Sequence, residues 1–158
     1  ALAIHSLANA MDGSASNSSA LAFCLFDSTQ YIGRLDENGY IRYECKSGFH
    51  LFWSRGQTND FVEADLAAGK TYFVVVSVKV GEVSPELRPV YPDNEYLVFS
   101  ILEFMSSRPA REYTAEHIQR AQKKQRKKVK KYLQRYEHHR SGGKLPAKLT
   151  RDMYIGSM

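Results

Sequence analysis

The stretch TYFVVVSVKV, residues 71–80, carries the strongest strand signal in this chain. One face of the predicted strand is apolar throughout and consists of Tyr72, Val74, Val76, Val78 and Val80. The opposite face starts apolar at Phe73 and Val75 and becomes polar at Ser77 and Lys79. Side chains alternate between the two faces of a strand, and β-branched residues favour this setting. We therefore expect a strand that starts inside a sheet and ends near its edge.

Shorter strands are predicted on the N-terminal side of this stretch, in ALAFCLFD (20–27), YIGRL (31–35), YIRYEC (40–45), FHLFWS (49–54) and FVEADL (61–66). The Asn38-Gly39 pair lies between two of them and predicts a hairpin, because both residues accept a positive φ. Turn signals recur every eight to twelve residues, which is typical of antiparallel sandwiches and barrels. The sequence therefore predicts a mainly-β fold, with an antiparallel β-sandwich over residues 20–92.

His50 is the second residue of one predicted strand and shares a face with Phe52 and Ser54. A single histidine in that position is more often a structural residue than a ligand. We therefore expect His50 to support the strand and assign it no catalytic or metal-binding role.

The pattern changes after Pro92. SPELRPVYP (84–92) contains three prolines and is expected to be mostly extended loop. Residues 93–107, DNEYLVFSILEFMSS, are apolar almost all round, which favours a buried helix packed on the sandwich, with a strand as the alternative. Residues 141–158 are expected to form a C-terminal tail.

A long basic helix is predicted over residues 114–140, between a Thr114 cap and the Gly142-Gly143 stop. A narrow contact stripe lies within about 100° of arc and contains Ile118, Gln122, Gln125, Val129, Tyr132, Leu133 and Tyr136. Basic residues outside this stripe are the candidates for binding an anionic surface: Arg120, Lys123, Lys124, Lys127, Lys128 and Lys131.

The 158-residue chain has a net charge of +5 that hides a strong asymmetry. Residues 1–107 hold 7 Lys+Arg against 13 Asp+Glu, a balance of −6, whereas residues 108–158 hold 15 against 4, a balance of +11. A basic segment on an acidic body can dock on that body, on an anionic polymer or on an anionic lipid surface. The charge alone does not choose among these.

Two cysteines, Cys24 and Cys45, permit a disulfide but do not demand one. A disulfide between them would close a loop of roughly 20 residues and stabilise the fold by about 3 kcal/mol. Two buried free thiols are the alternative.

The N-terminal residues carry a weak export signal. LANA (7–10) ends in the A-x-A pattern of a secretory signal peptide cleavage site, although no charged region precedes it. The Gly-, Ser- and Asn-containing segment that follows shows no periodicity, so residues 1–19 are expected to be a flexible lead-in.

The series YIGRL, an N-G turn, CKSGFH and AAGKTYFVVV resembles a family of bacterial envelope and lipoprotein-like β-sandwich domains of unknown function, related to the PEGA type. That family has the pattern V-G-x-L, P-G-x-H and A-G-K-x-Y-Y, and the matching residues here are Gly33, Gly48, His50, Gly69, Lys70 and Tyr72. This chain has Ser47 in place of the proline and Phe73 in place of the second tyrosine. The resemblance covers roughly residues 20–90. It implies an exported role in the periplasm or on a membrane anchor, with a cytoplasmic location as the alternative, and brings no catalytic residues.

No sequence motif for a hydrolase, a nucleotide-binding loop or a metal site is present. We therefore expect no catalytic, cofactor-binding or metal-binding residues and no small-molecule substrate. The leading hypothesis is a non-catalytic envelope interaction module whose basic helix contacts anionic lipid or polymer, or which binds a protein partner. A nucleic-acid-binding protein is the alternative, and an uncharacterised hydrolase is a distant third.

Overall fold

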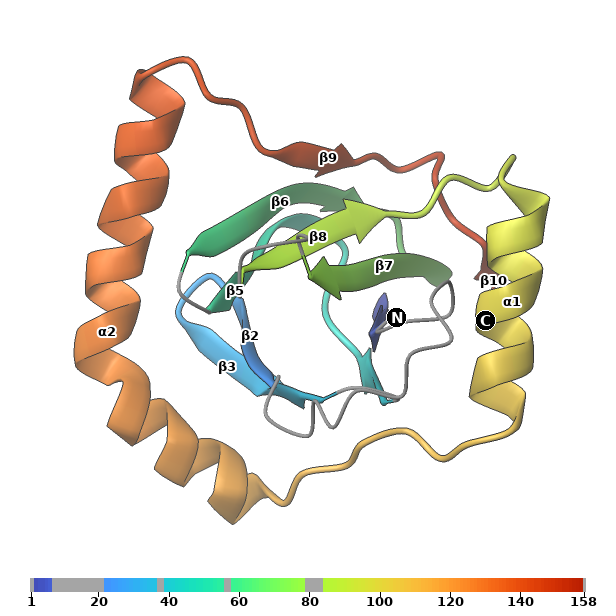
Figure 1. The fold of residues 1–158 in the computed structure, drawn as a ribbon, viewed down its shortest axis with the longest axis horizontal. Coiled ribbons are helices and arrows are strands. Elements are labelled where there is room, and N and C mark those ends of the chain that lie inside the picture. Colours follow the sequence, from blue (N-terminus) through green and yellow to red (C-terminus); the bar gives the residue numbers. More distant parts are fainter. Residues whose placement is uncertain (1, 7–21, 37–38, 56–57, 79–83, 158) are drawn as a thin grey trace.

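The computed structural model describes residues 2–6, 22–36, 39–55, 58–78 and 84–157. Within these residues the chain forms mainly strands, together with two helices (Figure 1). The strands are β1 (Leu2–Ser6), β2 (Phe23–Asp27), β3 (Gln30–Leu35), β4 (Tyr40–Tyr43), β5 (Gly48–Arg55), β6 (Asn59–Leu66), β7 (Lys70–Val78), β8 (Pro85–Pro89), β9 (Ala147–Leu149) and β10 (Gly156–Ser157). The helices are α1 (Glu95–Ser106) and α2 (Ala115–Ser141).

The strands form two open sheets of five strands each. One sheet has the order β10-β7-β1-β4, with β8 also paired to β7, and the other has the order β3-β2-β5-β6-β9. Most pairs are antiparallel, but β1 pairs with β7 and β6 pairs with β9 in parallel. The mainly-β prediction is therefore confirmed, and the sheets are mixed, with antiparallel pairs in the majority. Each parallel pair joins strands that are far apart in the sequence, so neither needs a tight turn.

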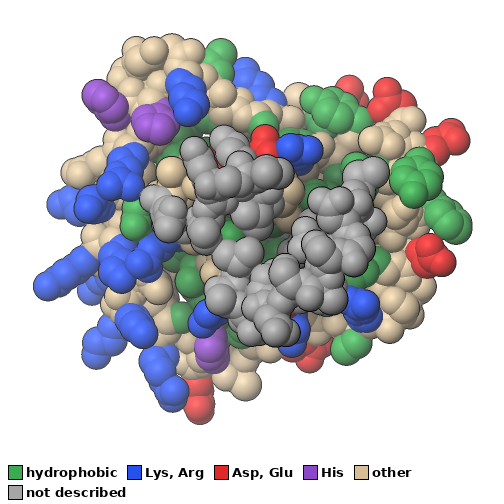
Figure 2. Space-filling model, viewed as in Figure 1, with side chains coloured by type: hydrophobic (Ala, Val, Ile, Leu, Met, Phe, Trp, Pro, Cys, Tyr) green, Lys and Arg blue, Asp and Glu red, His purple; other side chains and the backbone are tan. Residues whose placement is uncertain are grey.

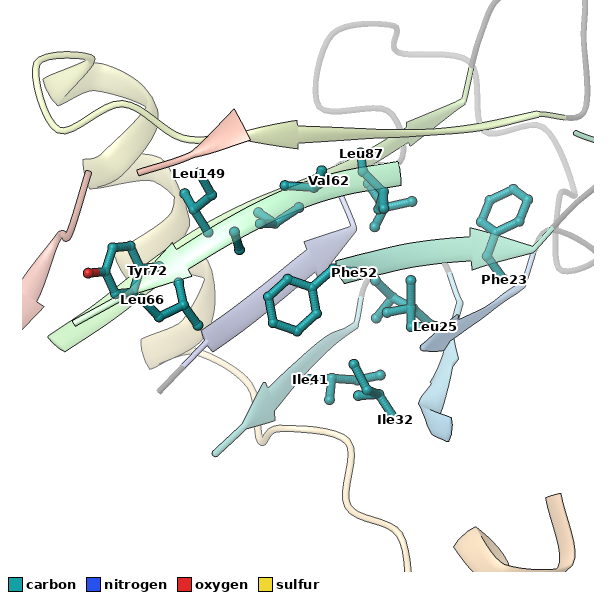
Figure 3. Close-up of a cluster of buried hydrophobic side chains, with 14 of the residues drawn as sticks. Phe23, Leu25, Ile32, Ile41, Phe52, Val62, Leu66, Tyr72, Leu87 and Leu149 are labelled. Carbon is teal, nitrogen blue, oxygen red and sulfur yellow. The ribbon is translucent and has the colours of Figure 1, made fainter. Parts of the chain in front are cut away.

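Side chains from both sheets meet in one core cluster, and the labelled members in Figure 3 point toward one another. The alternation predicted for residues 71–80 is confirmed within β7. Tyr72, Val74 and Val76 enter this core, whereas Phe73 and Val75 lie on the outer face of the same sheet. Phe52 contributes the neighbouring core ring from β5.

Each helix covers the outer face of one sheet, and the two helices lie on opposite sides of the strands (Figure 1). Helix α1 packs Leu97, Val98, Ile101 and Met105 against the outer face of β7. The helical interpretation of residues 93–107 is thus confirmed and the strand alternative is wrong. Helix α2 packs on the sheet that contains β2, β3, β5 and β6.

Asn38 lies outside the described residues, but the two strands that flank the predicted Asn38-Gly39 hairpin do not pair with each other. Strand β3 pairs with β2 in one sheet and β4 pairs with β1 in the other, so the connection between them passes from sheet to sheet. The tight turn instead joins β2 to β3, where Ser28 adopts a positive φ of 51°. Gly39 does not adopt a positive φ in this structure. The local Asn-Gly signal predicts a turn, but it does not specify which strands pair on either side of it.

Three segments expected outside the sheets belong to them. Residues 2–6, placed in the flexible lead-in, form β1; residues 147–149 and 156–157, placed in the tail, form β9 and β10. These strands are too short or too weakly alternating to be recognised from their own sequence. Residues 7–19, including the predicted cleavage signal, lie outside the described residues.

The proline-containing segment expected to be loop forms β8, paired with β7. Pro85, Leu87 and Pro89 occupy every second position of β8, so their backbone nitrogens point to the same side of the strand. The Leu87 N–H donates to Asp60 Oδ2 at 2.6 Å and not to β7. The N–H positions that face β7 therefore belong to Glu86 and Arg88, and the prolines remove no ladder hydrogen bond.

His50 supports the strand, as expected. Its Nδ1 lies 2.7 Å from Asp27 Oδ2, its Nε2 lies 2.8 Å from the Lys46 carbonyl, and its ring stacks on Phe52. Tyr43 also donates to the Asp27 carboxylate, at 3.2 Å, and burial beside that carboxylate raises the pKa of Tyr43. His50 thus links β5 to β2 and to the turn before β5.

Candidate functional site: the basic helix

Helix α2 begins after Thr114, whose hydroxyl accepts from the His117 N–H at 3.1 Å, and ends at the Gly142 cap. Its inner face packs on an aromatic cluster of the sheet that includes Phe26, Trp53 and Phe61. Every residue of the predicted contact stripe is buried or partly buried: Ile118, Gln122, Gln125, Val129, Tyr132, Leu133 and Tyr136. The stripe derived from the 100° step is therefore confirmed.

The two glutamines in this stripe bind the sheet directly. Gln122 accepts from the Tyr31 N–H at 2.5 Å and donates to the Thr29 carbonyl. Gln125 accepts from the Arg55 guanidinium. Strand β3 is an edge strand, and Gln122 satisfies a backbone donor that this edge would otherwise leave open. These residues attach the helix to the sheet by hydrogen bonds as well as by apolar contact.

A buried carboxylate holds the C-terminal end of α2. Glu63 accepts a 2.6 Å hydrogen bond from the Tyr136 hydroxyl and lies 3.3 Å from the Arg140 guanidinium. Burial, together with the hydrogen bond to Glu63 and its negative charge, raises the pKa of Tyr136 to about 12. Glu63 therefore has a structural partner at each of two positions on the helix.

The six predicted surface candidates are all exposed on α2: Arg120, Lys123, Lys124, Lys127, Lys128 and Lys131. None of the six forms an ion pair within the part of the chain that the structure describes. Lys and Arg side chains gather along the edge of the molecule that α2 occupies (Figure 2). Residues 115–141 contain ten Lys+Arg and two Glu, so this helix concentrates uncompensated positive charge.

Eight of the ten cations of α2 divide between two surfaces, whereas Arg135 lies over the Tyr132 ring and Arg140 pairs with Glu63. At 100° per residue, five exposed cations fall within about 100° of arc outside the contact stripe: Arg120, Lys124, Lys127, Lys128 and Lys131. We call these five residues the back face; Arg120 and Lys124 stand at its border, where they line a pocket with Cys24 and Tyr31. Lys123 instead lines a groove beside the contact stripe, together with Arg126 and Lys130. The sequence analysis did not include Arg126 and Lys130 among the candidates. A helical wheel of the whole helix would have placed both beside Lys123, next to the contact stripe.

The tyrosines near this helix are already engaged. Tyr132 packs near Trp53, and two guanidinium groups, from Arg55 and Arg135, lie 5.7 and 5.1 Å from its ring centre. Tyr113 stacks on His117 at 5.0 Å between ring centres. Tyr136 in turn donates to Glu63. None of these three tyrosines therefore supplies a free aromatic ring beside the back-face cations.

Cys24 and Cys45 are free thiols in this structure. Cys24 packs against the aromatic cluster under α2, whereas Cys45 packs against the core cluster between the sheets. Burial raises the pKa of both thiols. The candidate disulfide is therefore not formed, and the two cysteines belong to different packing environments.

No metal-binding cluster of three His, Cys, Asp or Glu side chains occurs among the described residues. None of the helices in those residues is both long and apolar enough to cross a bilayer. No family model, curated protein or solved structure matches this chain. The resemblance to envelope domains therefore stays a prediction that rests on the quoted residues.

Proposed function

We propose that this protein is a non-catalytic interaction module, a two-sheet sandwich that uses the back face of α2 to bind an anionic, phosphate-bearing surface. The observation that carries the proposal is a row of exposed cations on a helix whose opposite face is committed to the sheet. Docking of these cations on the acidic body would need ion pairs, and the described residues provide none for the back face. A partner outside the chain fits this arrangement better.

Charge supplies the affinity of such a surface. Each basic residue close to an anionic membrane contributes about 1 kcal/mol. The helix keeps the five back-face residues on one side, so they can reach one plane together. The contact is electrostatic, and binding should weaken steeply as salt is added.

Nucleic acid remains the second candidate, since phosphates are common to both partners. Proteins that bind single-stranded nucleic acid gain much of their binding energy from free aromatic rings that stack on bases. Tyr113, Tyr132 and Tyr136 already contact other residues of this chain. This favours the membrane or envelope-polymer partner. A location in the cell envelope forms part of the proposal through the family resemblance. Fractionation of cells that make the natural full-length protein tests it, and recovery only in the cytoplasmic fraction contradicts it.

Vesicle co-sedimentation at low salt tests the proposed function. Lys124→Glu, Lys127→Glu and Lys131→Glu together should weaken binding to phosphatidylglycerol vesicles by about 100-fold or more, from about 1 kcal/mol for each charge. Neutral phosphatidylcholine vesicles should not bind the wild type.

A second triple variant, Lys46→Glu, Lys144→Glu and Lys148→Glu, is the matched control. It changes the net charge equally at exposed positions outside α2 and should keep most of the binding. Equal losses in the two triples would mean that net charge, and not the back face, drives association. Tight binding of single-stranded oligonucleotide without vesicle binding would favour the nucleic-acid alternative.

A further inference from the structure

Helix α1 exposes an apolar face away from the sheet. Tyr96 is 81% exposed and Phe99 is 67% exposed, and Leu102 lies one turn further along the same face. The inner side of this helix already packs on the sheet through Leu97, Val98 and Ile101. Adjacent large apolar side chains in water mark a contact site more often than isolated ones do.

Acidic residues flank this face. Glu95 and Glu103 are exposed and lie on the same side of the helix as Tyr96 and Phe99, one near each end of the apolar face. Neither glutamate forms an ion pair within the described residues. Residues 93–107 contain no Lys or Arg. Figure 2 shows hydrophobic and acidic side chains along the edge of the molecule that α1 occupies. A partner for this helix should therefore be apolar in the middle and basic at its rim.

The groove beside α2 has that chemistry. It has an open volume of about 1050 Å³. Its apolar lining includes Leu51, Val129 and Leu133, and its charged lining consists of three cations, Lys123, Arg126 and Lys130, and one acid, Glu137. These three cations form no ion pair within the described residues.

The spacings of the two surfaces agree. Glu95 and Glu103 are eight residues apart, about 12 Å along a helix, and Lys123 and Lys130 are seven residues apart, about 10 Å. We propose that α1 of one copy of this chain occupies the α2 groove of a second copy, with Phe99 on the apolar lining and the two glutamates on the rim cations. Pairing of α1 with α1 would instead bring acidic flanks together, which costs energy.

Such an interaction is head-to-tail. Because α1 and α2 lie on opposite sides of the strands (Figure 1), a copy that donates its helix keeps its own groove open. Head-to-tail contacts grow into chains or close into rings, whereas a two-fold contact stops at a dimer. This inference goes beyond the proposed function, since it uses the groove rim and leaves the back face free.

Sedimentation velocity across a concentration series tests the proposal with two variants. The helix variant carries Tyr96→Ser and Phe99→Ser, and the groove variant carries Lys123→Glu and Arg126→Glu. Wild type should form a series of growing species, and each variant alone should stay monomeric. An equimolar mixture should give a 1:1 dimer and nothing larger, because each variant keeps the surface that the other lacks.

Matched controls separate this contact from general effects. Phe49→Ser removes an equally exposed aromatic ring, 78% exposed, from β5 and should leave assembly unchanged. Lys127→Glu with Lys131→Glu reverses back-face charges and should also assemble as wild type does. Far-ultraviolet circular dichroism checks that each variant is folded.

Three results would overturn the proposal. Wild type could stay monomeric at every concentration, or the groove variant could dimerise through α1 alone. The helix variant could also lose binding to phosphatidylglycerol vesicles while wild-type assembly is absent, which would make the α1 face a membrane contact.

Discussion

The ring of Tyr113 lies directly on the backbone of Gly33. A Cβ atom at position 33 would be 2.5 Å from Tyr113 Cε2 and 3.0 Å from Ile41 Cδ1. The Tyr113 hydroxyl accepts from the Arg34 N–H at 3.0 Å and donates to the Arg34 carbonyl. This contact ties the segment between α1 and α2 to strand β3, immediately before the basic helix begins.

Replacement of Gly33 by alanine should therefore destabilise the fold. The methyl group forces Tyr113 or Ile41 to move, and overpacking of this kind costs about 1–3 kcal/mol. Urea unfolding of Gly33→Ala measures the loss. Gly156→Ala is the matched control, because a Cβ at Gly156 meets no atom within 4 Å and should change stability little. Equal stability of the two variants would show that Tyr113 does not hold this position.

Removal of the Gln122 side chain should loosen α2. Gln122→Ala leaves the Tyr31 N–H and the Thr29 carbonyl without their side-chain partner, at a cost of about 1–3 kcal/mol if water does not replace it. Gln119→Ala, on an exposed position of the same helix, should have almost no effect. Hydrogen exchange of the first turns of α2 provides the local measurement. Unchanged protection in Gln122→Ala would contradict the anchoring role.

Alkaline pH should weaken the attachment of α2 through Tyr136. In the folded protein the pKa of Tyr136 is raised to about 12, above the ordinary value of about 10. Folding therefore favours the protonated phenol over the phenolate. The stabilisation from this group is thus complete below about pH 10 and is lost as the pH rises through about 12. The stability difference between wild type and Tyr136→Phe should shrink over this window in urea titrations. A difference that stays constant would contradict the Glu63 contact.

Both cysteines should react slowly in the folded protein. Burial raises the pKa of each thiol and so reduces the thiolate fraction that reacts with alkylating reagents. Iodoacetamide, added without a reductant, should label both Cys24 and Cys45 only after unfolding, as mass spectrometry would show. Failure to label either thiol in the unfolded protein would instead indicate a disulfide.

The local pattern predicted the strands that alternate over several residues. Tyr72, Val74 and Val76 enter the core because β7 is long enough to show its period, and the stripe of α2 follows from the same reasoning at 100° per residue. The parallel partners of β7 and β6 could not be predicted. They depend on which distant segment reaches an open sheet edge, and strands as short as Ala147–Leu149 carry too few residues to show a period.

The candidate site was predicted in part for a similar reason. Charge counting identified α2, but it treated Lys123 as equivalent to Lys127, although only Lys123 lines the groove. The outer face of α1 was missed because its sequence is apolar all round, which indicates burial on every side. Only the fold shows that one side of α1 faces the sheet and that Tyr96 and Phe99 do not.

Lysine footprinting on vesicles tests the central claim most directly, that the back face of α2 is the binding surface. Brief acetylation followed by mass spectrometry compares the reactivity of each lysine with and without phosphatidylglycerol vesicles. The account predicts strong protection of Lys124, Lys127, Lys128 and Lys131, and unchanged reactivity of Lys46, Lys144 and Lys148. Protection of the second group, or equal protection of every lysine, would contradict it.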